Sequence, residues 1–249
     1  NANNSRYYKK IFDKFKISAD SLNSLDDLKR LPFTVKQDLR DEFPDGFIAV
    51  DKSQIVRLHS SSGTTGQSTA IYHTQRDLNV WTNLVARSLY MAGFRNKDVF
   101  QNMMGYGLFT GGLGLHYGAE RLGMMVIPAG SGNSHRQIEL LIQYKSTAMH
   151  IIPSYSFYLY TYFQQMNLDP KIDTFLKKAV LGAEPHTEET RKNIEEIYGV
   201  DAYNCYGLSE MNGPGVGFEC QEKNGIHICE DNYIVEIINP ETLEPVKDG

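Results

Sequence analysis

A short polar segment, Ser-Ser-Ser-Gly-Thr-Thr-Gly-Gln-Ser at residues 60–68, constrains this 249-residue chain more than any other part of the sequence. It stands between residues 55–59 and residues 69–73, two runs with the composition of strands. A polar segment between two strands is a positioned turn, whereas a flexible linker has no such flanks. Gly63 and Gly66 permit backbone angles that turn successive N–H groups toward one anion, and the neighbouring hydroxyls add donors. The pattern predicts a phosphate-binding loop, although its spacing is not that of a Walker A motif.

Composition and charge narrow the class of protein. A hydrophobic content of 41% and a charged content of 22% are typical of globular proteins. The net charge of -5 gives no electrostatic reason to expect nucleic acid or an anionic membrane as a partner. No apolar run has the length of a membrane span, and no signal peptide opens the chain. We therefore expect a cytoplasmic protein that binds neither nucleic acid nor membrane.

Strand-like and helix-like segments alternate along most of the sequence. After an N-terminal helical segment, residues 1–53, we expect strands near residues 55–59, 69–73, 99–103, 124–127, 147–152, 178–181 and 201–205, and helices near residues 75–93, 136–144, 155–166 and 187–198. This alternation predicts an α/β domain over residues 54–249, with mainly parallel sheets flanked by helices. In such sheets ligands bind at the carboxyl ends of the strands.

Three further segments carry residues suited to binding. Seven glycines interleaved with aromatic and aliphatic residues lie within 105–123, a composition that suits either a pocket for a small ring or the close packing of a helix on a sheet. Gly182-Ala183-Glu184-Pro185 follows one expected strand, where the alternative is a simple strand-to-helix connection. Tyr206-Gly207-Leu208-Ser209-Glu210 follows another and offers an aromatic ring, a hydroxyl and a carboxylate, unless it is a plain surface turn.

Taken together and in this order, the segments at 61–66, 182–185 and 206–210 resemble those of the adenylate-forming enzymes. Within that superfamily the chain resembles the phenylacetate–coenzyme A ligases. The further matching segments are Leu31-Pro32-Phe33-Thr34, residues 105–112, residues 116–121, Pro153-Ser154-Tyr155 and residues 230–238. The resemblance covers nearly the whole chain. It implies the large N-terminal domain of such an enzyme, truncated within the ATP- and acid-binding domain and without the C-terminal lid domain.

The resemblance implies a function and assigns roles to residues. Such enzymes use ATP and Mg²⁺ to convert a carboxylic acid to an acyl-adenylate, which coenzyme A then attacks to give a thioester. Thr64, Ser209 and Glu210 are the implied catalytic residues, with Glu210 as the magnesium ligand. The implied nucleotide-binding residues are Ser61, Ser62, Gly63, Thr64, Thr65, Gly66, Ala183, Glu184, Pro185, Tyr206, Gly207 and Ser209. Those implied for an aryl acid such as phenylacetate are Met104, Tyr106, Phe109 and Gly111, where Met104 replaces an aromatic residue of close relatives.

Two other functions stay open on the same residues. The adenylate could be loaded onto a carrier-protein thiol, or the chain could be a nucleotide- or acyl-CoA-binding module without turnover. The truncation predicts that the isolated chain turns over weakly or not at all. The resemblance also allows a homodimer, of which the sequence carries no readable trace.

The three cysteines suggest a separate hypothesis. Cys205, Cys220 and Cys229 lie within 25 residues of one another, with His227 among them. Three thiolates and an imidazole suit tetrahedral Zn²⁺, but the spacing matches no standard zinc motif. The alternative is three reduced thiols, since cysteine is commonly buried. The remaining histidines are interpreted as packing or surface residues, with His59 and His116 as exceptions near the glycine-rich segments.

The phosphate loop carries Gln67 where lysine is usual in the resembled family, which removes one positive charge from the path of the pyrophosphate. We predict that Gln67→Lys binds ATP several-fold more tightly, because a charge-assisted contact is stronger than a neutral one. Isothermal titration of ATP into both proteins measures this, and equal affinities would contradict the prediction.

Overall fold

The computed structural model describes residues 4–61 and 68–246. The described helices are α1 (Arg6–Phe15), α2 (Lys36–Asp41), α3 (Gln75–Met91), α4 (Thr110–Leu122), α5 (Ser134–Gln143), α6 (Pro153–Gln165), α7 (Pro170–Asp173) and α8 (Glu188–Tyr198). The strands are β1 (Ile55–Ser61), β2 (Thr69–Thr74), β3 (Val99–Asn102), β4 (Met125–Ile127), β5 (Ala148–Ile151), β6 (Lys178–Leu181), β7 (Asp201–Leu208), β8 (Gly213–Glu219) and β9 (Ile226–Ile228). Short 3-10 helices include η5 (Ser209–Met211). No described helix is long and apolar enough to cross a membrane.

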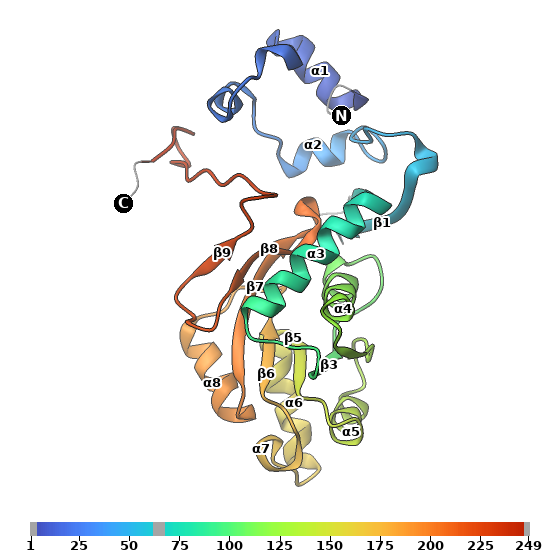
Figure 1. Ribbon diagram of the computed structural model, residues 1–249, viewed down its shortest axis with the longest axis vertical. Coiled ribbons are helices and arrows are strands. Elements are labelled where there is room, and N and C mark those ends of the chain that lie inside the picture. The colour runs from blue at the N-terminus through green and yellow to red at the C-terminus, as the bar shows by residue number, and fades with distance from the viewer. Residues whose placement is uncertain (1–3, 62–67, 247–249) are drawn as a thin grey trace.

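A seven-stranded sheet in the order β4-β3-β5-β6-β7-β8-β9 forms the centre of the molecule (Figure 1). The five strands from β4 to β7 run parallel, and β8 and β9 extend the sheet antiparallel. The predicted mainly parallel α/β fold is confirmed, and every strand and helix expected between residues 55 and 205 is present with shifts of a few residues at its ends. Strands β1 and β2 pair separately as an antiparallel hairpin.

Alternate residues of the central strands enter two different hydrophobic cores. Ala148 and Val180 pack with α3 and α4 on one face, whereas Met149, Ala179 and Leu181 pack with α5, α6 and α8 on the other. The sheet is therefore buried on both faces, as parallel sheets require. Polar side chains that serve a ligand must lie at the strand ends.

Local sequence signals set the helix boundaries near the expected positions. The Thr74 side chain caps α3 by accepting from the Asp77 backbone N–H, and the Asp77 carboxylate accepts in turn from the Thr74 backbone N–H. The Thr187 hydroxyl caps α8 by accepting from the Thr190 backbone N–H, and Gly199 ends that helix in the left-handed conformation. These caps follow directly from the sequence.

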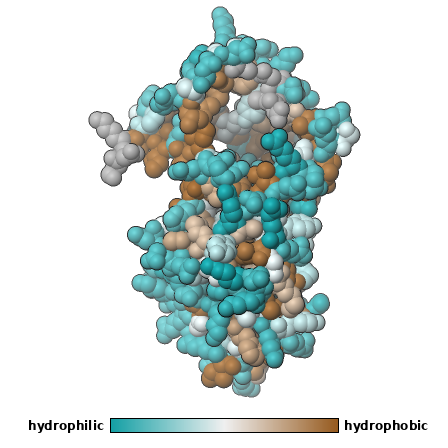
Figure 2. All heavy atoms as spheres, in the orientation of Figure 1, coloured by the Kyte–Doolittle hydropathy of each residue, from teal (hydrophilic) through white to brown (hydrophobic). Residues whose placement is uncertain are grey.

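The N-terminal residues form a small helical unit above the sheet (Figure 1). Tyr7 of α1 stacks on Phe47 with ring centroids 4.3 Å apart, and Glu42 pairs with Arg6 and Lys10. On the face shown in Figure 2, hydrophilic residues cover most of the lower body, and hydrophobic residues gather in the upper part. The division of the chain at residue 53 stays a prediction.

Helix α4 packs unusually close to α3, and its glycines make this approach sterically allowed. A Cβ atom added at Gly118 would lie 2.2 Å from Cγ1 and 2.5 Å from Cβ of Val85 in α3. A Cβ added at Gly114 would lie 2.4 Å from the Trp81 ring. These glycines therefore allow close packing on α3 and, at Gly114, also on the sheet as expected, where an added Cβ would lie 2.7 Å from Pro214 of β8.

We predict that Gly118→Ala destabilises the protein by about 1–3 kcal/mol through overpacking, although alanine favours a helix over glycine by about 1 kcal/mol. Urea unfolding followed by circular dichroism measures the change. Gly107→Ala is the matched control, because a Cβ there meets no atom within 4 Å. A Gly118→Ala protein as stable as the wild type would refute the packing argument.

Candidate active site

Two of the predicted binding segments meet in one cavity at the carboxyl ends of β6 and β7. Ala183, Glu184 and Pro185 after β6, and Tyr206 and Gly207 in β7, line a cavity of about 350 Å³. Tyr206 is 50% exposed, so one face of its ring is free to receive a planar ligand. The remaining lining residues are His186, Asn204, Cys205 and Ile226, none of which the sequence singled out for this cavity.

Specific contacts hold both segments in place. The Glu184 carboxylate accepts from the Ser154 backbone N–H at 2.5 Å and from its hydroxyl at 3.0 Å, at the N-terminus of α6. Negative charge is favoured there by the helix dipole. Ala183 has a φ of 72°, and a non-glycine residue in this region marks a turn that its surroundings fix.

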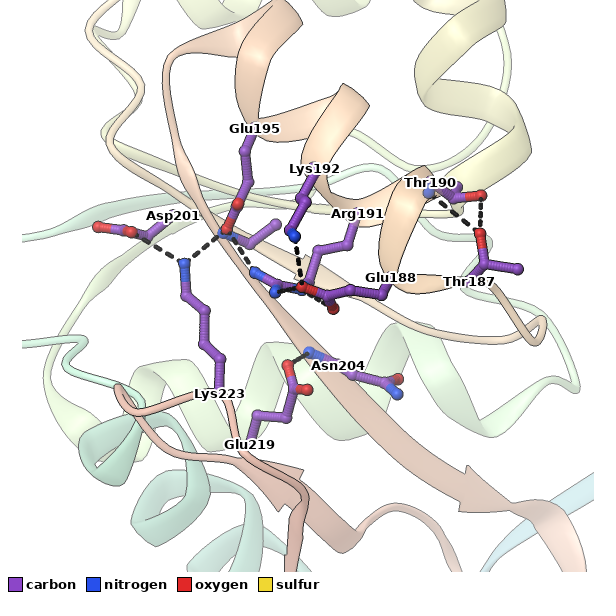
Figure 3. Close-up of polar contacts among 11 residues, drawn as sticks. Thr187, Glu188, Thr190, Arg191, Lys192, Glu195, Asp201, Asn204, Glu219 and Lys223 are labelled. Carbon is purple, nitrogen blue, oxygen red and sulfur yellow. Dashed lines mark hydrogen bonds and ion pairs between the residues drawn. The ribbon is translucent and has the colours of Figure 1, made fainter.

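A polar network anchors the opposite end of β7 (Figure 3). Lys223, in the turn between β8 and β9, donates to Glu195 of α8 and to Asp201 at the start of β7. Arg191 of α8 donates to Glu188 and Glu195. The neighbouring carboxylates raise the pKa of Arg191 despite its burial. This network fixes the strand whose carboxyl end carries Tyr206, Ser209 and Glu210.

A second, smaller cavity adjoins the first. Its volume is about 40 Å³, and Ala183, Cys205 and Gly207 line both cavities. Three of the four predicted acid-binding residues, Met104, Phe109 and Gly111, line it. An engineered cavity of roughly 150 Å³ accommodates benzene, so a phenyl ring needs more room than this cavity has. Phe109 lies against Gly111, where an added Cβ would meet the ring at 2.4 Å.

The fourth predicted acid-binding residue, Tyr106, lies beside this cavity rather than in its lining. Its hydroxyl accepts from Nδ2 of Asn102 at 2.9 Å and lies 3.1 Å from Nδ1 of His116. Burial raises the pKa of Tyr106 to about 12, so the phenol keeps its proton. His150, interpreted from the sequence as a packing residue, lines the cavity instead.

Ser209 and Glu210 lie in η5, directly after β7. The Ser209 hydroxyl is 3.4 Å from that of Thr110 at the start of α4, a residue not identified from the sequence. The Glu210 carboxylate pairs with Lys36 of α2, with Oε1 and Nζ 3.0 Å apart. Glu210 also borders a cavity of about 320 Å³ between the N-terminal unit and β2. One carboxylate of this kind, together with phosphate oxygens, suits Mg²⁺.

The base of the predicted phosphate loop lies next to the small cavity. Ser61 ends β1, and its hydroxyl lies 2.6 Å from that of Thr69 at the start of β2. The Leu108 carbonyl, from the segment that carries Phe109, accepts from the Ser60 backbone N–H at 3.0 Å. Ser62, Gly63, Thr64, Thr65, Gly66 and Gln67 lie outside the described residues, so their roles stay predictions.

The four predicted zinc ligands do not come together. Cys205 in β7 and His227 in β9 both pair with Phe218 of β8, so two strand spacings, about 10 Å, separate their backbones. Burial raises the pKa of Cys205 to about 12, which disfavours the thiolate that zinc needs. Within residues 4–61 and 68–246, which include all four side chains, no group of three or more metal-ligating residues is placed to hold an ion. The proposed zinc site is therefore not formed by these residues.

Known proteins with a similar sequence identify the family of this chain. The family model described as AMP-binding enzyme matches residues 14–249. The chain belongs to the AMP-binding enzyme family. It is 46% identical over 243 residues to a phenylacetate–coenzyme A ligase of Pseudomonas putida and 45% identical over 244 residues to that of Thermus thermophilus. These alignments cover 97% and 98% of this chain and 55% of each relative, so the chain spans about half their length.

Among solved structures, an open conformation of a 2-hydroxyisobutyryl-CoA ligase in complex with 2-HIB-AMP and CoA superposes with a TM-score of 0.92 at 27% identity. The match covers 99% of this chain and 59% of that one. A benzoate CoA ligase from Burkholderia xenovorans matches with a TM-score of 0.64 at 17% identity, which shows the fold alone. The family resemblance read from the segments at 61–66, 182–185 and 206–210 is thus confirmed.

Two buried histidines, one on each strand of the β1–β2 hairpin, lie next to Trp81 of α3. His73 of β2 stacks on Trp81 with centroids 5.6 Å apart, and His59 of β1 meets His73 edge-on at 5.4 Å. Among the described residues, neither ring nitrogen of His73 has a hydrogen-bond partner. Burial, together with His59 and Arg57, lowers the pKa of His73 to about 4, and Asp77 opposes this weakly.

The folded-state pKa of His73 lies below its unfolded value of about 6.5, so the unfolded chain binds the proton first as pH falls. We predict that acidification from pH 6.5 to pH 4 costs up to about 3 kcal/mol of stability through this residue. Urea unfolding at several pH values measures the free energy of unfolding. Below pH 6.5 this free energy should fall less steeply with pH in His73→Phe, which keeps the stack on Trp81, than in the wild type. His227→Gln, at an exposed position in β9, should keep the wild-type slope. An unchanged slope in His73→Phe would contradict this account.

Proposed function

We propose that this chain forms the nucleotide- and acid-binding part of an enzyme that activates a carboxylic acid with ATP and transfers the acyl group to coenzyme A. The observation that carries the proposal is the adjoining pair of cavities. One is lined by the segments at 183–185 and 206–207, and the other by Met104, Phe109 and Gly111. A nucleotide in the first cavity would bring its α-phosphate near Ser209, between the base and the acid.

The positions of these segments support a different role for each of them. Ala183 and Pro185 would border the adenine and Tyr206 would stack on it, while the 61–66 segment would hold the β- and γ-phosphates. The acid carboxylate and the α-phosphate are both anionic, so the site must offset their repulsion as they approach. Thr110 begins α4 beside Ser209, so the positive end of that helix faces the point of approach.

Magnesium would neutralise phosphate charge at Glu210 when bound. The Lys36 ammonium, 3.0 Å from the same carboxylate, adds a positive charge contributed by the N-terminal unit. Coenzyme A is proposed as the acyl acceptor because the similar proteins are ligases of coenzyme A. A cytoplasmic location and a homodimer stay predictions.

ATP–pyrophosphate exchange, measured with the complete protein that contains this chain, tests the proposal. We expect acid-dependent exchange with at least one aryl or short-chain acid, and acyl-CoA formation when coenzyme A is added. Exchange without acyl-CoA formation would favour transfer to a carrier-protein thiol. No exchange with any acid, despite measurable ATP binding, would favour a binding module.

We further predict that Glu210→Gln lowers the exchange rate at least tenfold and raises the Mg²⁺ concentration required, because the charged metal ligand is lost. The matched control is Glu189→Gln, at an exposed position in the first turn of α8. Circular dichroism of both variants verifies folding. A normal magnesium requirement in Glu210→Gln would remove Glu210 from the metal site.

A further inference from the structure

The inference concerns the small cavity and rests on the proposed function. His150 is the next-to-last residue of β5, near the carboxyl edge of the sheet, and is only 3% exposed. It lines the cavity together with Met104, Phe109 and Gly111. Its ring stacks on Phe100 with centroids 6.5 Å apart and an interplanar angle of 17°. The imidazole is thus held rigidly at the wall of the predicted acid site.

The hydrogen-bond partners of Asn102 fix the orientation of its amide. Asn102 lies directly opposite His150 on β3. Its Nδ2 donates to the Gly112 carbonyl at 2.7 Å, and a carbonyl can only accept. The second proton on Nδ2 faces the Tyr106 hydroxyl at 2.9 Å. Oδ1 must therefore be the atom that faces Nδ1 of His150, at 2.9 Å.

This orientation fixes the tautomer of His150. Because Oδ1 of Asn102 accepts, Nδ1 of His150 carries the proton and donates. Burial lowers the pKa of His150 to about 3, so the ring is neutral at physiological pH. Nε2 can then only accept, and no described residue donates a hydrogen bond to it. Because His150 lines the cavity, a hydroxyl group of a ligand bound there could donate to Nε2.

The remainder of the hydrogen-bond chain reinforces this polarity. The Tyr106 hydroxyl accepts from Asn102, so its own proton points to Nδ1 of His116 at 3.1 Å. Nε2 of His116 then donates to Oε1 of Glu120 at 3.0 Å. His150, Asn102, Tyr106 and His116 thus each donate to the next residue of a chain that ends at the Glu120 carboxylate. An acceptor at the far end favours this direction.

We propose that His150 is a specificity-determining residue and that the acid cavity takes a carboxylic acid bearing a hydroxyl group, which donates its hydrogen bond to Nε2. An apolar acid of the same shape leaves that acceptor unpaired and binds more weakly. A site built to pair a substrate hydroxyl discriminates far more strongly against the analogue lacking it than an apolar pocket does. Because the cavity is small, a bound acid makes few contacts there, and one hydrogen bond is a large share of them.

The test is acid-dependent exchange by the complete protein with pairs of acids that differ by one hydroxyl group. Because a phenyl ring needs more room than the small cavity has, the pairs are short-chain acids: isobutyrate is compared with 2-hydroxyisobutyrate, and butyrate with 2-hydroxybutyrate. We expect kcat/KM for at least one hydroxylated acid to exceed that of its parent tenfold or more. Equal or better use of both parent acids overturns the proposal, even though exchange itself then upholds the proposed function. Absence of exchange with every acid counts against the proposed function and, with it, against this inference.

Two variants then identify the residue responsible. His150→Met replaces the ring with an apolar side chain and should abolish the preference, by lowering kcat/KM for the hydroxylated acid and raising it for the parent. His150→Gln keeps an acceptor and should retain part of the preference. His135→Gln, at an exposed position in α5, is the control and should leave the preference unchanged. Circular dichroism verifies folding. If His150→Met does not fold, the acid pairs still decide, because equal use of the hydroxylated and the parent acid by the wild type opposes the proposal.

Discussion

Burial of the parallel sheet on both faces is the constraint on which the rest of this structure depends. Because alternate residues of each central strand enter different hydrophobic cores, the strand interiors carry apolar side chains such as Met149 and Val180. Chemistry is confined to the carboxyl ends, where Asn102, His150 and the segments after β6 and β7 gather. The site thus follows from the fold, because four neighbouring strands of the sheet place residues at or near their carboxyl ends along one edge.

The close contact between α3 and α4 brings the remaining parts of the site together. Because Gly114 and Gly118 allow α4 to lie against Trp81 and Val85, the start of α4 reaches Ser209. The segment before α4 then lies near the hairpin that carries the predicted phosphate loop, to which it is joined through the Leu108 carbonyl. Gly114 and Gly118 thus serve packing, whereas Gly111, at the start of the same helix, lines the small cavity. The sequence presented packing and a pocket as alternatives, and this one segment contributes to both.

Much of the fold and part of the site could be predicted from local sequence. The caps at Thr74 and Thr187 and the alternation of strands and helices reflect interactions between near neighbours in the chain. The pairing of residues 183–185 with residues 206–207 was predictable because parallel strands share a carboxyl edge. The pairing of Lys36 with Glu210 was not predictable, since it joins residues 174 positions apart through the placement of a separate helical unit. The zinc hypothesis failed for a related reason. The cysteines are close in sequence, but Phe218 of β8 lies between two of the predicted ligands, Cys205 and His227, in the sheet.

His150 shows most clearly what sequence alone cannot reveal. A single histidine at the end of an apolar strand is usually a packing residue, and nothing near it in the sequence indicates its partner. Its role depends on which of its nitrogens is protonated, and that is set by Asn102, 48 residues away, which in turn is oriented by the Gly112 carbonyl. An apolar side chain at position 150 would pack in the core at a smaller cost in folding free energy, because burying a polar group without a full set of partners is unfavourable. In the hydrogen-bond chain from His150 to Glu120, Nε2 of His150 has no partner among the described residues, and His150 lines the small cavity. Packing does not require that arrangement, whereas the proposed recognition of a hydroxyl group would use it.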